Sequence, residues 1–323
     1  MVKGSVLVTG CDSGLGLALL CKTTAGQNVA ASVIEGRNID ILSCRSDCHG
    51  GLCLLDKGAT YVLDITRLDE VEGFREVLED KLNNGDLPPL YSIVNNAGIW
   101  RFGLTTEAFK SRERRKVAVE TWREVLDVNL IGTLQITLAL GNLLKSNSNN
   151  FAPRIFFISS VLDSHSLPGQ GAYVASKFAI CGLHETLCHE LDGNIIPIIV
   201  KPGALKNTKL FNRDLNVEEP VDVYSDGDED IIKASYRLLL KTGGDCRVVA
   251  QTVLYGLEQK YPKYEYSNFV GAIPFKIADY VPRVAFVKLV KLVLQNLALL
   301  YFPVRRLFKL VWYKTWGKSR NAD

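Results

Sequence analysis

Residues 5–16 read SVLVTGCDSGLG, and this stretch decides the fold. An apolar run of strand length leads directly into a glycine-rich turn, and an apolar segment of helical period follows it. Glycines let the backbone turn tightly, and they let a phosphate approach the amide N–H groups at the start of a helix, where the dipole favours an anion. Taken alone, the same glycines also fit a plain tight turn, so the rest of the chain must decide between the two interpretations.

Short runs rich in Val and Ile alternate with segments of helical period along the first 240 residues. Strands that are apolar on both faces and separated by helix-length segments are typical of a parallel sheet covered on both sides. The pattern predicts an α/β fold, a Rossmann-like doubly wound parallel sheet in a single domain. Strands are expected at 5–9, 29–34, 60–63, 92–95, 154–159 and 195–201, and helices at 15–24, 70–83, 121–145, 173–191 and 231–241.

Four further motifs follow the glycine turn in order. They are the run Asn-Asn-Ala-Gly at 95–98, Asn129 within the longest predicted helix, Ser160 at the end of the fifth strand, and Tyr173 with Lys177 at the start of the next helix. In these motifs the sequence resembles the short-chain dehydrogenase/reductase family, over about residues 4–255. The runs TGCDSGLG, ISSV and YVASKFA resemble most the branch of retinol dehydrogenases, 17-beta-hydroxysteroid dehydrogenases and D-beta-hydroxybutyrate dehydrogenase.

Tyr173 and Lys177 are four residues apart, so a helix places them on one face. A nearby ammonium favours the phenolate, and we expect it to lower the pKa of Tyr173 in the direction that acid/base catalysis needs. The resemblance implies that Tyr173 exchanges the proton of the reacting oxygen and that Ser160 holds that oxygen. It also implies that Lys177 binds the nicotinamide ribose and that Asn129 anchors a water that relays protons.

The resemblance also implies a nicotinamide cofactor. The residue that selects between NAD and NADP aligns near Val33, where Glu35 would repel the extra phosphate of NADP and Arg37 would attract it. Better-known members of the branch with a similar stretch use NAD, so the resemblance implies NAD as the expected cofactor, with NADP left open. The implied cofactor-binding residues are Gly10, Ser13, Gly14, Leu15, Gly16, Asp64, Asn95, Ala97, Gly98, Tyr173, Lys177, Pro202, Gly203 and Thr208.

The family encloses its substrate between the loop that joins Ser160 to Tyr173 and the segment after Pro202-Gly203, here residues 204–240. Apolar side chains in both suit a retinoid or a hydroxysteroid, so the expected reaction is hydride transfer to or from a secondary or allylic alcohol or its carbonyl. The polar side chains there could orient a small carboxylate, as in a D-3-hydroxybutyrate dehydrogenase, or face solvent; they are His165, Gln170 and Lys206. An alternative of another class is a catalytically silent nucleotide-binding scaffold.

Eight scattered cysteines and a first apolar run of only a few residues predict reduced thiols in an intracellular protein without a signal peptide. Cys44, Cys48, His49 and Cys53 lack the usual CxxC spacing of a zinc site, so a loop insertion over 36–58 is preferred and no metal site is expected. The two histidines His184 and His189 are five residues apart, which on a helix prevents them from sharing one metal.

Charge is distributed unevenly along the chain. Residues 281–323 carry nine Lys or Arg and one acidic residue, a net charge of +8, whereas the other 280 residues carry −5. The apolar face of 284–301 is too broad for a soluble surface helix, and Trp and basic residues follow it. This pattern favours membrane-associating helices at 284–316; packing on the core or on a partner chain is the alternative, and nucleic acid fits poorly.

The expected organisation is therefore a catalytic core over 1–255 and a C-terminal amphipathic extension over 256–323. We expect a homodimer or homotetramer that acts on a small lipophilic substrate. The expected location is an intracellular membrane, of the endoplasmic reticulum or the mitochondrion.

Overall fold

The structure is a computed structural model of the chain. It describes residues 4–11, 14–24, 39–45, 53–55, 58–147, 149–206, 208–211, 232–233, 236–237, 240, 243–267, 281–290 and 292. The strand expected at 29–34, and with it Val33, Glu35 and Arg37, lies outside these residues.

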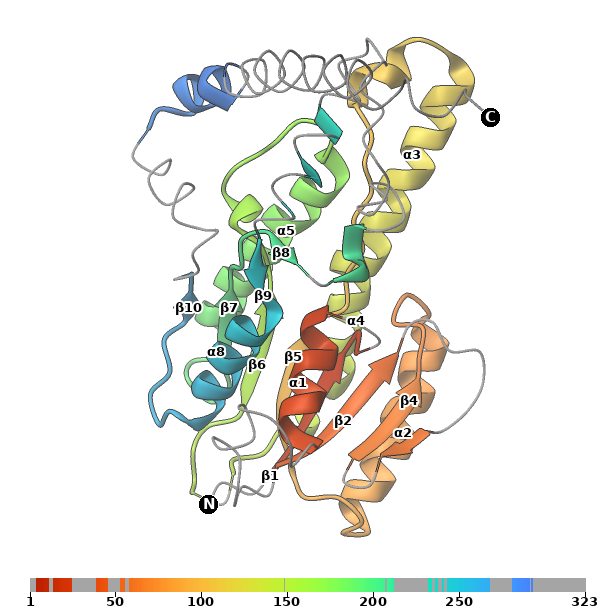
Figure 1. The fold of residues 1–323 in the computed structure, drawn as a ribbon. Helices are drawn as coiled ribbons and strands as arrows, with labels where there is room; N and C mark the ends of the chain where they lie inside the picture. Colours follow the sequence, from red (N-terminus) through yellow and green to blue (C-terminus); the bar gives the residue numbers. More distant parts are fainter. Residues whose placement is uncertain are drawn as a thin grey trace, which may run out of the picture.

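A single sheet forms the centre of the molecule (Figure 1). Its strands follow the order β3-β4-β2-β1-β5-β6-β7-β10, and all neighbouring pairs are parallel except β3 with β4. The strand bounds are β1 Gly4–Thr9, β2 Ile39–Arg45, β3 Cys53–Leu55, β4 Gly58–Val62, β5 Leu90–Asn95, β6 Arg154–Ile158, β7 Ile196–Val200 and β10 Glu265–Tyr266. A second, two-stranded pairing joins β8 Leu205–Lys206 to β9 Gly244–Asp245.

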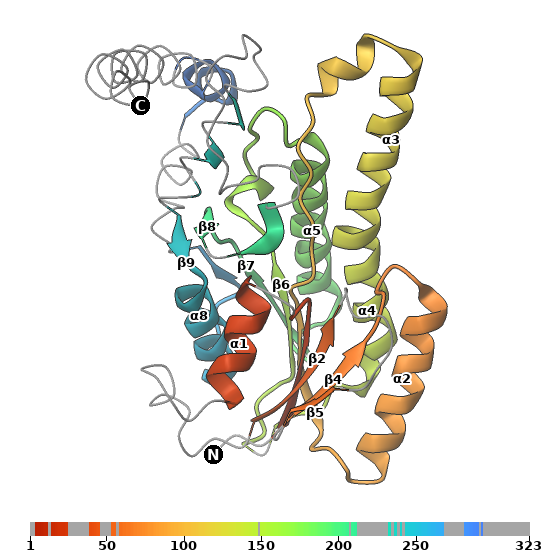
Figure 2. The same ribbon diagram turned by 45° about the vertical axis from the view of Figure 1, so that its right-hand side comes forward.

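Helices cover both faces of the sheet, as Figure 2 shows, which confirms the doubly wound α/β prediction. Successive residues of a strand point to opposite faces, and in β1 Val6 and Val8 enter one apolar cluster while Leu7 enters the other. The first cluster packs under α1 and α8, and the second under α2, α4 and α5. The helix bounds are α1 Gly14–Thr24, α2 Leu68–Asn83, α3 Arg112–Leu126, α4 Thr133–Leu140, α5 Gly171–Glu190 and α8 Cys246–Glu258.

The longest helical run joins α3 to α4 through one π-helical turn, Asp127–Gly132. It begins at Arg112, nine residues before the expected start, because Ser111 caps it by accepting a hydrogen bond from the Arg114 amide at 3.2 Å. By length and composition the run 112–143 is the one helix among the described residues that could cross a membrane. Its second half packs against the sheet through Ile136 and Leu140, so we interpret it as a core helix.

Two expectations about the chain's organisation are wrong. Residues 39–45 and 53–55, expected to belong to an insertion loop, are strands of the main sheet. Residues 39–44 pair with residues 4–9 of β1, and β3 pairs with β4. The boundary expected after residue 255 falls inside α8, and β10 beyond it pairs with β7. The described core therefore extends to residue 267.

Candidate active site

The four expected catalytic residues come from three elements and are all buried. Ser160 follows the end of β6, and Tyr173 and Lys177 lie in the first turns of α5. Asn129 lies in the π-helical turn between α3 and α4. The carboxyl ends of parallel strands meet at one edge of the sheet, which is where open α/β folds place their ligands.

Tyr173 and Lys177 lie together on one face of α5, as their spacing predicts. The Lys177 ammonium is 5.5 Å from the centre of the Tyr173 ring, and it donates a hydrogen bond to the carbonyl oxygen of Ile158 at 2.8 Å. The Ser160 side chain hydrogen-bonds Tyr173, and its oxygen also accepts a bond from the Leu162 amide at 3.1 Å. The side chains of Ser160, Tyr173 and Lys177 therefore form one buried cluster.

Burial dominates the acid/base properties of this pair. It raises the pKa of Tyr173 to about 12, although the hydrogen bond with Ser160 opposes the rise. It lowers the pKa of Lys177 to about 8, and the negative charge of Asp163 opposes that fall. The expectation of a lowered pKa for Tyr173 is thus wrong for the protein alone, because desolvation disfavours the phenolate.

Asn129 is held by three hydrogen bonds. Its side-chain oxygen accepts from the Ile99 amide at 2.7 Å, and its nitrogen donates to the Ile99 carbonyl at 2.9 Å and to Ser176 at 3.0 Å. A Cβ placed on Gly98 would lie 3.3 Å from the Asn129 side-chain oxygen and 3.9 Å from the Lys177 ammonium nitrogen. Gly98 therefore lies close to both Asn129 and Lys177, and a side chain there would be in tight contact with Asn129.

The glycine turn packs directly against the Asn-Asn-Ala-Gly motif. Gly10 has φ +68°, and a Cβ there would lie 2.7 Å from the Ala97 Cα, while one on Gly16 would lie 2.2 Å from the Gly10 carbonyl oxygen. The Asn96 side chain, which was not among the expected site residues, donates hydrogen bonds to the carbonyl oxygens of Thr9 and Gly10 at 2.9 Å each. Its position inside the Asn-Asn-Ala-Gly motif is the sequence feature that could have identified it.

Thr208 lies close to the same turn. A Cβ on Gly14 would lie 2.9 Å from the Thr208 hydroxyl oxygen, so side chains larger than hydrogen are excluded between them. Leu15 is the second residue of α1 and its side chain is buried, and Ser13 lies outside the described residues. A bare glycine turn at the start of a helix, with a hydroxyl beside it, fits the diphosphate of a dinucleotide.

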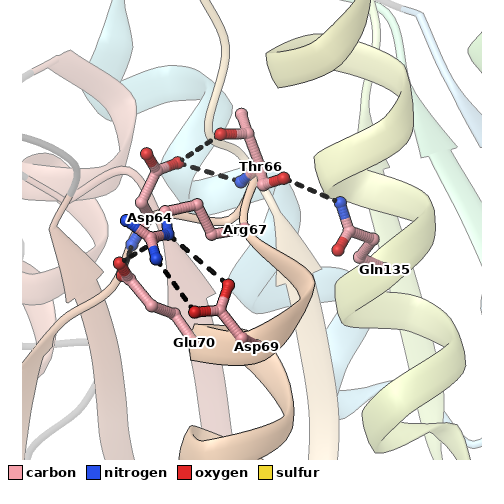
Figure 3. A network of polar contacts seen from close by, with 6 residues as sticks. All are labelled: Asp64, Thr66, Arg67, Asp69, Glu70 and Gln135. Carbon is pink, nitrogen blue, oxygen red and sulfur yellow. Dashed lines mark hydrogen bonds and ion pairs between the residues drawn. The ribbon is translucent and has the colours of Figure 1, made fainter.

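Asp64 lies at the turn that follows β4 (Figure 3). Its carboxylate accepts hydrogen bonds from the Thr66 amide at 2.9 Å and the Thr66 hydroxyl at 2.7 Å. Gln135 of α4 donates to the Thr66 carbonyl at 3.2 Å, and Arg67 pairs with the acidic residues that begin α2. These contacts fix the turn, and Asp64 remains exposed at its surface.

Two further expected cofactor sites, Asn95 and the Pro202-Gly203 segment, have different surroundings. The Asn95 amide nitrogen donates to Thr137 at 3.1 Å, so this side chain points toward α4. Pro202 is buried, and its carbonyl oxygen accepts a bond from the Val161 amide at 3.0 Å. That bond places the Pro202-Gly203 segment beside the turn that carries Ser160.

The loop between Ser160 and Tyr173, which is expected to enclose the substrate, contains buried polar side chains. His165 and Gln170 are both buried, so the alternative in which they face solvent is wrong for these two, whereas Lys206 is exposed. Gln170 accepts a hydrogen bond from the Trp100 indole at 2.9 Å, and the Trp100 ring packs edge-on against Phe211 at 5.3 Å. These aromatic side chains were missed because no spacing rule links residues so far apart in sequence.

The described cysteines and histidines show no metal centre. His184 is buried and His189 exposed, so the two lie on different sides of α5, as expected. Among the described side chains, no group of three His, Cys, Asp or Glu could hold a metal ion. Cys181, Cys188 and Cys246 are thiols; Cys48 and His49 lie outside the described residues.

Comparisons with known proteins agree with this geometry. The family model for short chain dehydrogenases matches residues 4–218. The chain is 26% identical to mouse 17-beta-hydroxysteroid dehydrogenase type 6 over 311 residues, covering 85% of this chain and 86% of that protein. It is 26% identical to mouse retinol dehydrogenase 7 over 286 residues, covering 81% and 79%.

Solved structures share the fold. A short-chain dehydrogenase of Burkholderia cenocepacia in complex with NADP superposes with a TM-score of 0.60 at 22% identity, over 89% of this chain and 98% of that one. A short-chain dehydrogenase/reductase of Burkholderia phymatum in complex with NAD gives 0.59 at 19% identity, over 89% and 95%.

The fold and the site thus define a nicotinamide-dependent oxidoreductase that acts on CH–OH groups. The chain belongs to the short-chain dehydrogenase family, and it resembles the hydroxysteroid and retinol dehydrogenases within it.

Proposed function

We propose that the protein transfers a hydride between a nicotinamide cofactor and a secondary or allylic alcohol, or its carbonyl, on a lipophilic retinoid or hydroxysteroid. The observation that carries this proposal is the buried grouping of Ser160, Tyr173 and Lys177 beside Asn129. The names of the relatives, a hydroxysteroid dehydrogenase and a retinol dehydrogenase, support the substrate class.

Each catalytic side chain has a proposed role. Tyr173 is protonated at neutral pH, so it can donate its proton to a carbonyl oxygen in reduction, while Ser160 holds that oxygen. In oxidation Tyr173 must accept the alcohol proton, and the adjacent Lys177 ammonium and the Ser160 hydrogen bond both stabilise the phenolate. Asn129 orders the backbone at Ile99 next to Lys177. It also anchors a water molecule that relays protons from Lys177 to the solvent. The bound cofactor supplies or accepts the hydride.

The substrate side supports a lipophilic ligand. Trp100, Tyr236 and Tyr173 belong to one apolar cluster, and Leu205 and Phe211 of the proposed substrate-covering segment 204–240 pack against it. Gln170, which could have oriented a carboxylate, is engaged by two aromatic side chains: its oxygen accepts from the Trp100 indole, and it also hydrogen-bonds Tyr236. A planar, apolar substrate would therefore meet aromatic surface next to Tyr173.

A D-3-hydroxybutyrate dehydrogenase is the second candidate, and one observation favours it. The ammonium of Lys233 lies 5.1 Å from the centre of the Phe102 ring, at the margin of this aromatic cluster, where it could attract a carboxylate. A Lys233→Met variant separates the candidates: turnover of hydroxybutyrate should fall, whereas turnover of a retinoid should not.

The decisive experiment is a panel of retinol, hydroxysteroids and 3-hydroxybutyrate, each with NAD and with NADP, followed by the absorbance of the reduced nicotinamide. We expect turnover with a lipophilic alcohol and a loss of about 10²-fold or more in Tyr173→Phe. Retained turnover in that variant would show that Tyr173 is not the group that exchanges the proton of the reacting oxygen. Cofactor binding without turnover across the whole panel would favour the silent scaffold.

We propose NAD as the cofactor, on the basis of Glu35 in the sequence. NADP remains in the same panel because Arg37 in the sequence would attract its additional phosphate. A lower KM for NADP than for NAD would overturn the choice of NAD.

We propose further that the extension attaches the enzyme to an intracellular membrane, of the endoplasmic reticulum or the mitochondrion. In the helical turn at 283–290, Val284 and Leu289 are 70% and 51% exposed, and the tail carries a charge of +8. Phe286 of the same turn packs on His165 of the substrate loop at 4.9 Å. A membrane contact here would bring lipophilic substrates close to the active site.

Flotation with vesicles of phosphatidylcholine and phosphatidylserine tests this attachment. We expect the full chain to float and a chain that ends at residue 280 to stay at the bottom. Val284→Asp with Leu289→Asp should weaken flotation, whereas Tyr261→Asp, at another exposed position, should not. Equal flotation of the full and shortened chains would contradict the proposal.

We propose a homodimer formed through the α3–α4 helical run. Ile131 and Leu138 are 41% and 69% exposed and lie seven residues apart, so they share one side of the helix. Exposed aliphatic side chains in such a row suit a helix of a second copy.

A further inference from the structure

An acidic side chain lies buried next to the catalytic residues, outside the set that the family motifs identify. Asp163 ends the helical turn Val161–Asp163 that follows Ser160, and its side chain is 0% exposed. One of its carboxylate oxygens accepts a hydrogen bond from the Ser159 hydroxyl at 3.0 Å and lies 3.3 Å from the Lys201 ammonium nitrogen. Lys201 also pairs with Glu265 of β10 at 3.0 Å.

This pair joins two segments whose relative position matters for the proposed reaction. Lys201 directly precedes Pro202-Gly203. Asp163 is the last residue of the helical turn that Ser160 caps. Main-chain bonds connect the same segments: the Ser159 amide donates to the Val200 carbonyl at 2.8 Å, and the Val161 amide to the Pro202 carbonyl at 3.0 Å. The Asp163–Lys201 pair therefore lies across a junction between the substrate side and the cofactor side.

Stability alone does not explain a charged pair in this place. Burial raises the pKa of the Asp163 carboxyl, and the Lys201 ammonium and the Ser159 hydroxyl oppose that rise. The second carboxylate oxygen of Asp163 is buried and has no hydrogen-bond partner within the described residues. Apolar side chains of similar size commonly stabilise a fold at least as well as a buried ion pair, so a role in the reaction is the better explanation.

We propose, resting on the function proposed above, that the Asp163–Lys201 pair is a positioning device. It locks the Ser160 turn to the Pro202-Gly203 segment and holds a fixed negative charge beside Tyr173 and Lys177. Neither residue touches the reacting atoms.

The charge acts on both catalytic groups in the same direction. The negative charge of Asp163 raises the pKa of Tyr173 and that of Lys177, so it keeps Lys177 protonated at higher pH. Removing the charge lowers both pKa values. Other charged or titratable side chains lie near the pair, and they contribute to its pH dependence. They come from β10 and from α5 and are Glu265, Tyr173, Lys177, Cys181, His184 and Glu185.

The test uses Asp163→Asn, which keeps an oxygen for Ser159 and removes the charge. We expect the acid limb of the kcat profile for alcohol oxidation to move to lower pH by about half a unit or more. We also expect the KM for the cofactor to rise several-fold, because the Pro202-Gly203 segment loses its tether. Asp86→Asn, an exposed position between α2 and β5, serves as the matched control and should change neither quantity.

Two further variants separate positioning from folding. Lys201→Arg retains the charge and should preserve the profile, whereas Lys201→Met breaks the same tether and should raise the KM for the cofactor as Asp163→Asn does. A folded Asp163→Asn protein with an unchanged profile and an unchanged cofactor KM would overturn the proposal. Should no alcohol be turned over by the wild type, the dissociation constant for the reduced cofactor gives an independent measure, and equal constants in wild type and Asp163→Asn would equally overturn it.

Discussion

At the scale of the residue, burial of Lys177 makes stability depend on pH. The pKa of this lysine is about 8 in the folded protein and 10.5 in its ordinary state. Between these values the unfolded state binds more protons, so the free energy of unfolding rises with pH.

We expect the wild type without cofactor to gain about 2–3 kcal/mol relative to Lys177→Met between about pH 7 and about pH 10. Urea unfolding of both proteins at several pH values measures the difference. If the free energy of unfolding changed equally with pH in both proteins, the Lys177 ammonium would not be desolvated in the folded protein.

The glycine turn gives a second prediction with an internal control. Gly16→Ala places a methyl group 2.2 Å from the Gly10 carbonyl oxygen, so the backbone of the turn must move. We expect a loss of about 2–4 kcal/mol in the free energy of unfolding and at least tenfold weaker cofactor binding. Gly73→Ala, inside α2 with no atom within 4 Å, should instead gain about 0.5–1 kcal/mol. Thermal unfolding and titration with reduced cofactor report both effects.

The residues that the motifs identify were predictable because motif spacing encodes their geometry. Tyr173 and Lys177 do share a face of α5. Asp163 and Lys201 meet across 38 positions of sequence, and Trp100 meets Gln170 across 70. Such pairs depend on where the chain returns in space, so neither composition nor periodicity could predict them. The pKa of Tyr173 was misjudged because burial is a tertiary property.

At the scale of the element, Arg154 connects β6 to the end of α8. It is fully buried at the start of its strand and donates to the carbonyl oxygens of Gly256, Leu257 and Gln259. A helix end carries unsatisfied carbonyls and a partial negative charge, so a cation there is doubly favourable.

Arg154→Met should therefore lower the free energy of unfolding by about 3 kcal/mol, as measured by the urea midpoint, since it leaves buried carbonyls without donors. Arg247→Met, an exposed position at the other end of α8, should change it by less than about 1 kcal/mol. Similar losses in both variants would show that Arg154 contributes no more than a surface ion pair.

Most elements with a strong apolar period were predictable, including β1, β5, β6, β7 and α5. The polar stretch 112–120 has no such period, so the early start of α3 was missed; its helix depends on the Ser111 cap and on continuity with the buried turns beyond. The parallel pairing of β2 with β1 was also missed, because a short apolar run between Gly and Cys residues fits a loop equally well.

At the scale of the whole molecule, the proposed dimer predicts a simple change in mass. Leu138→Glu places a charge on an exposed position of α4, so we expect the monomer to remain folded and the dimer to dissociate. Light scattering coupled to gel filtration measures the mass directly. Phe109→Glu, exposed before the start of α3, is the control that should leave the dimer intact. A dimer that survives Leu138→Glu would place the interface elsewhere.

The two-residue strand β10 matters beyond its size. The Tyr264 and Tyr266 carbonyls accept hydrogen bonds from the Ile199 and Lys201 amides at 2.8 and 2.9 Å, so β10 covers the last edge of the sheet. A chain shortened at residue 255 would bare β7, a fully apolar strand, and bare edges recruit strands from other molecules. Such a fragment would precipitate for reasons unrelated to its tail, and solubility trials on it would misreport what the tail does.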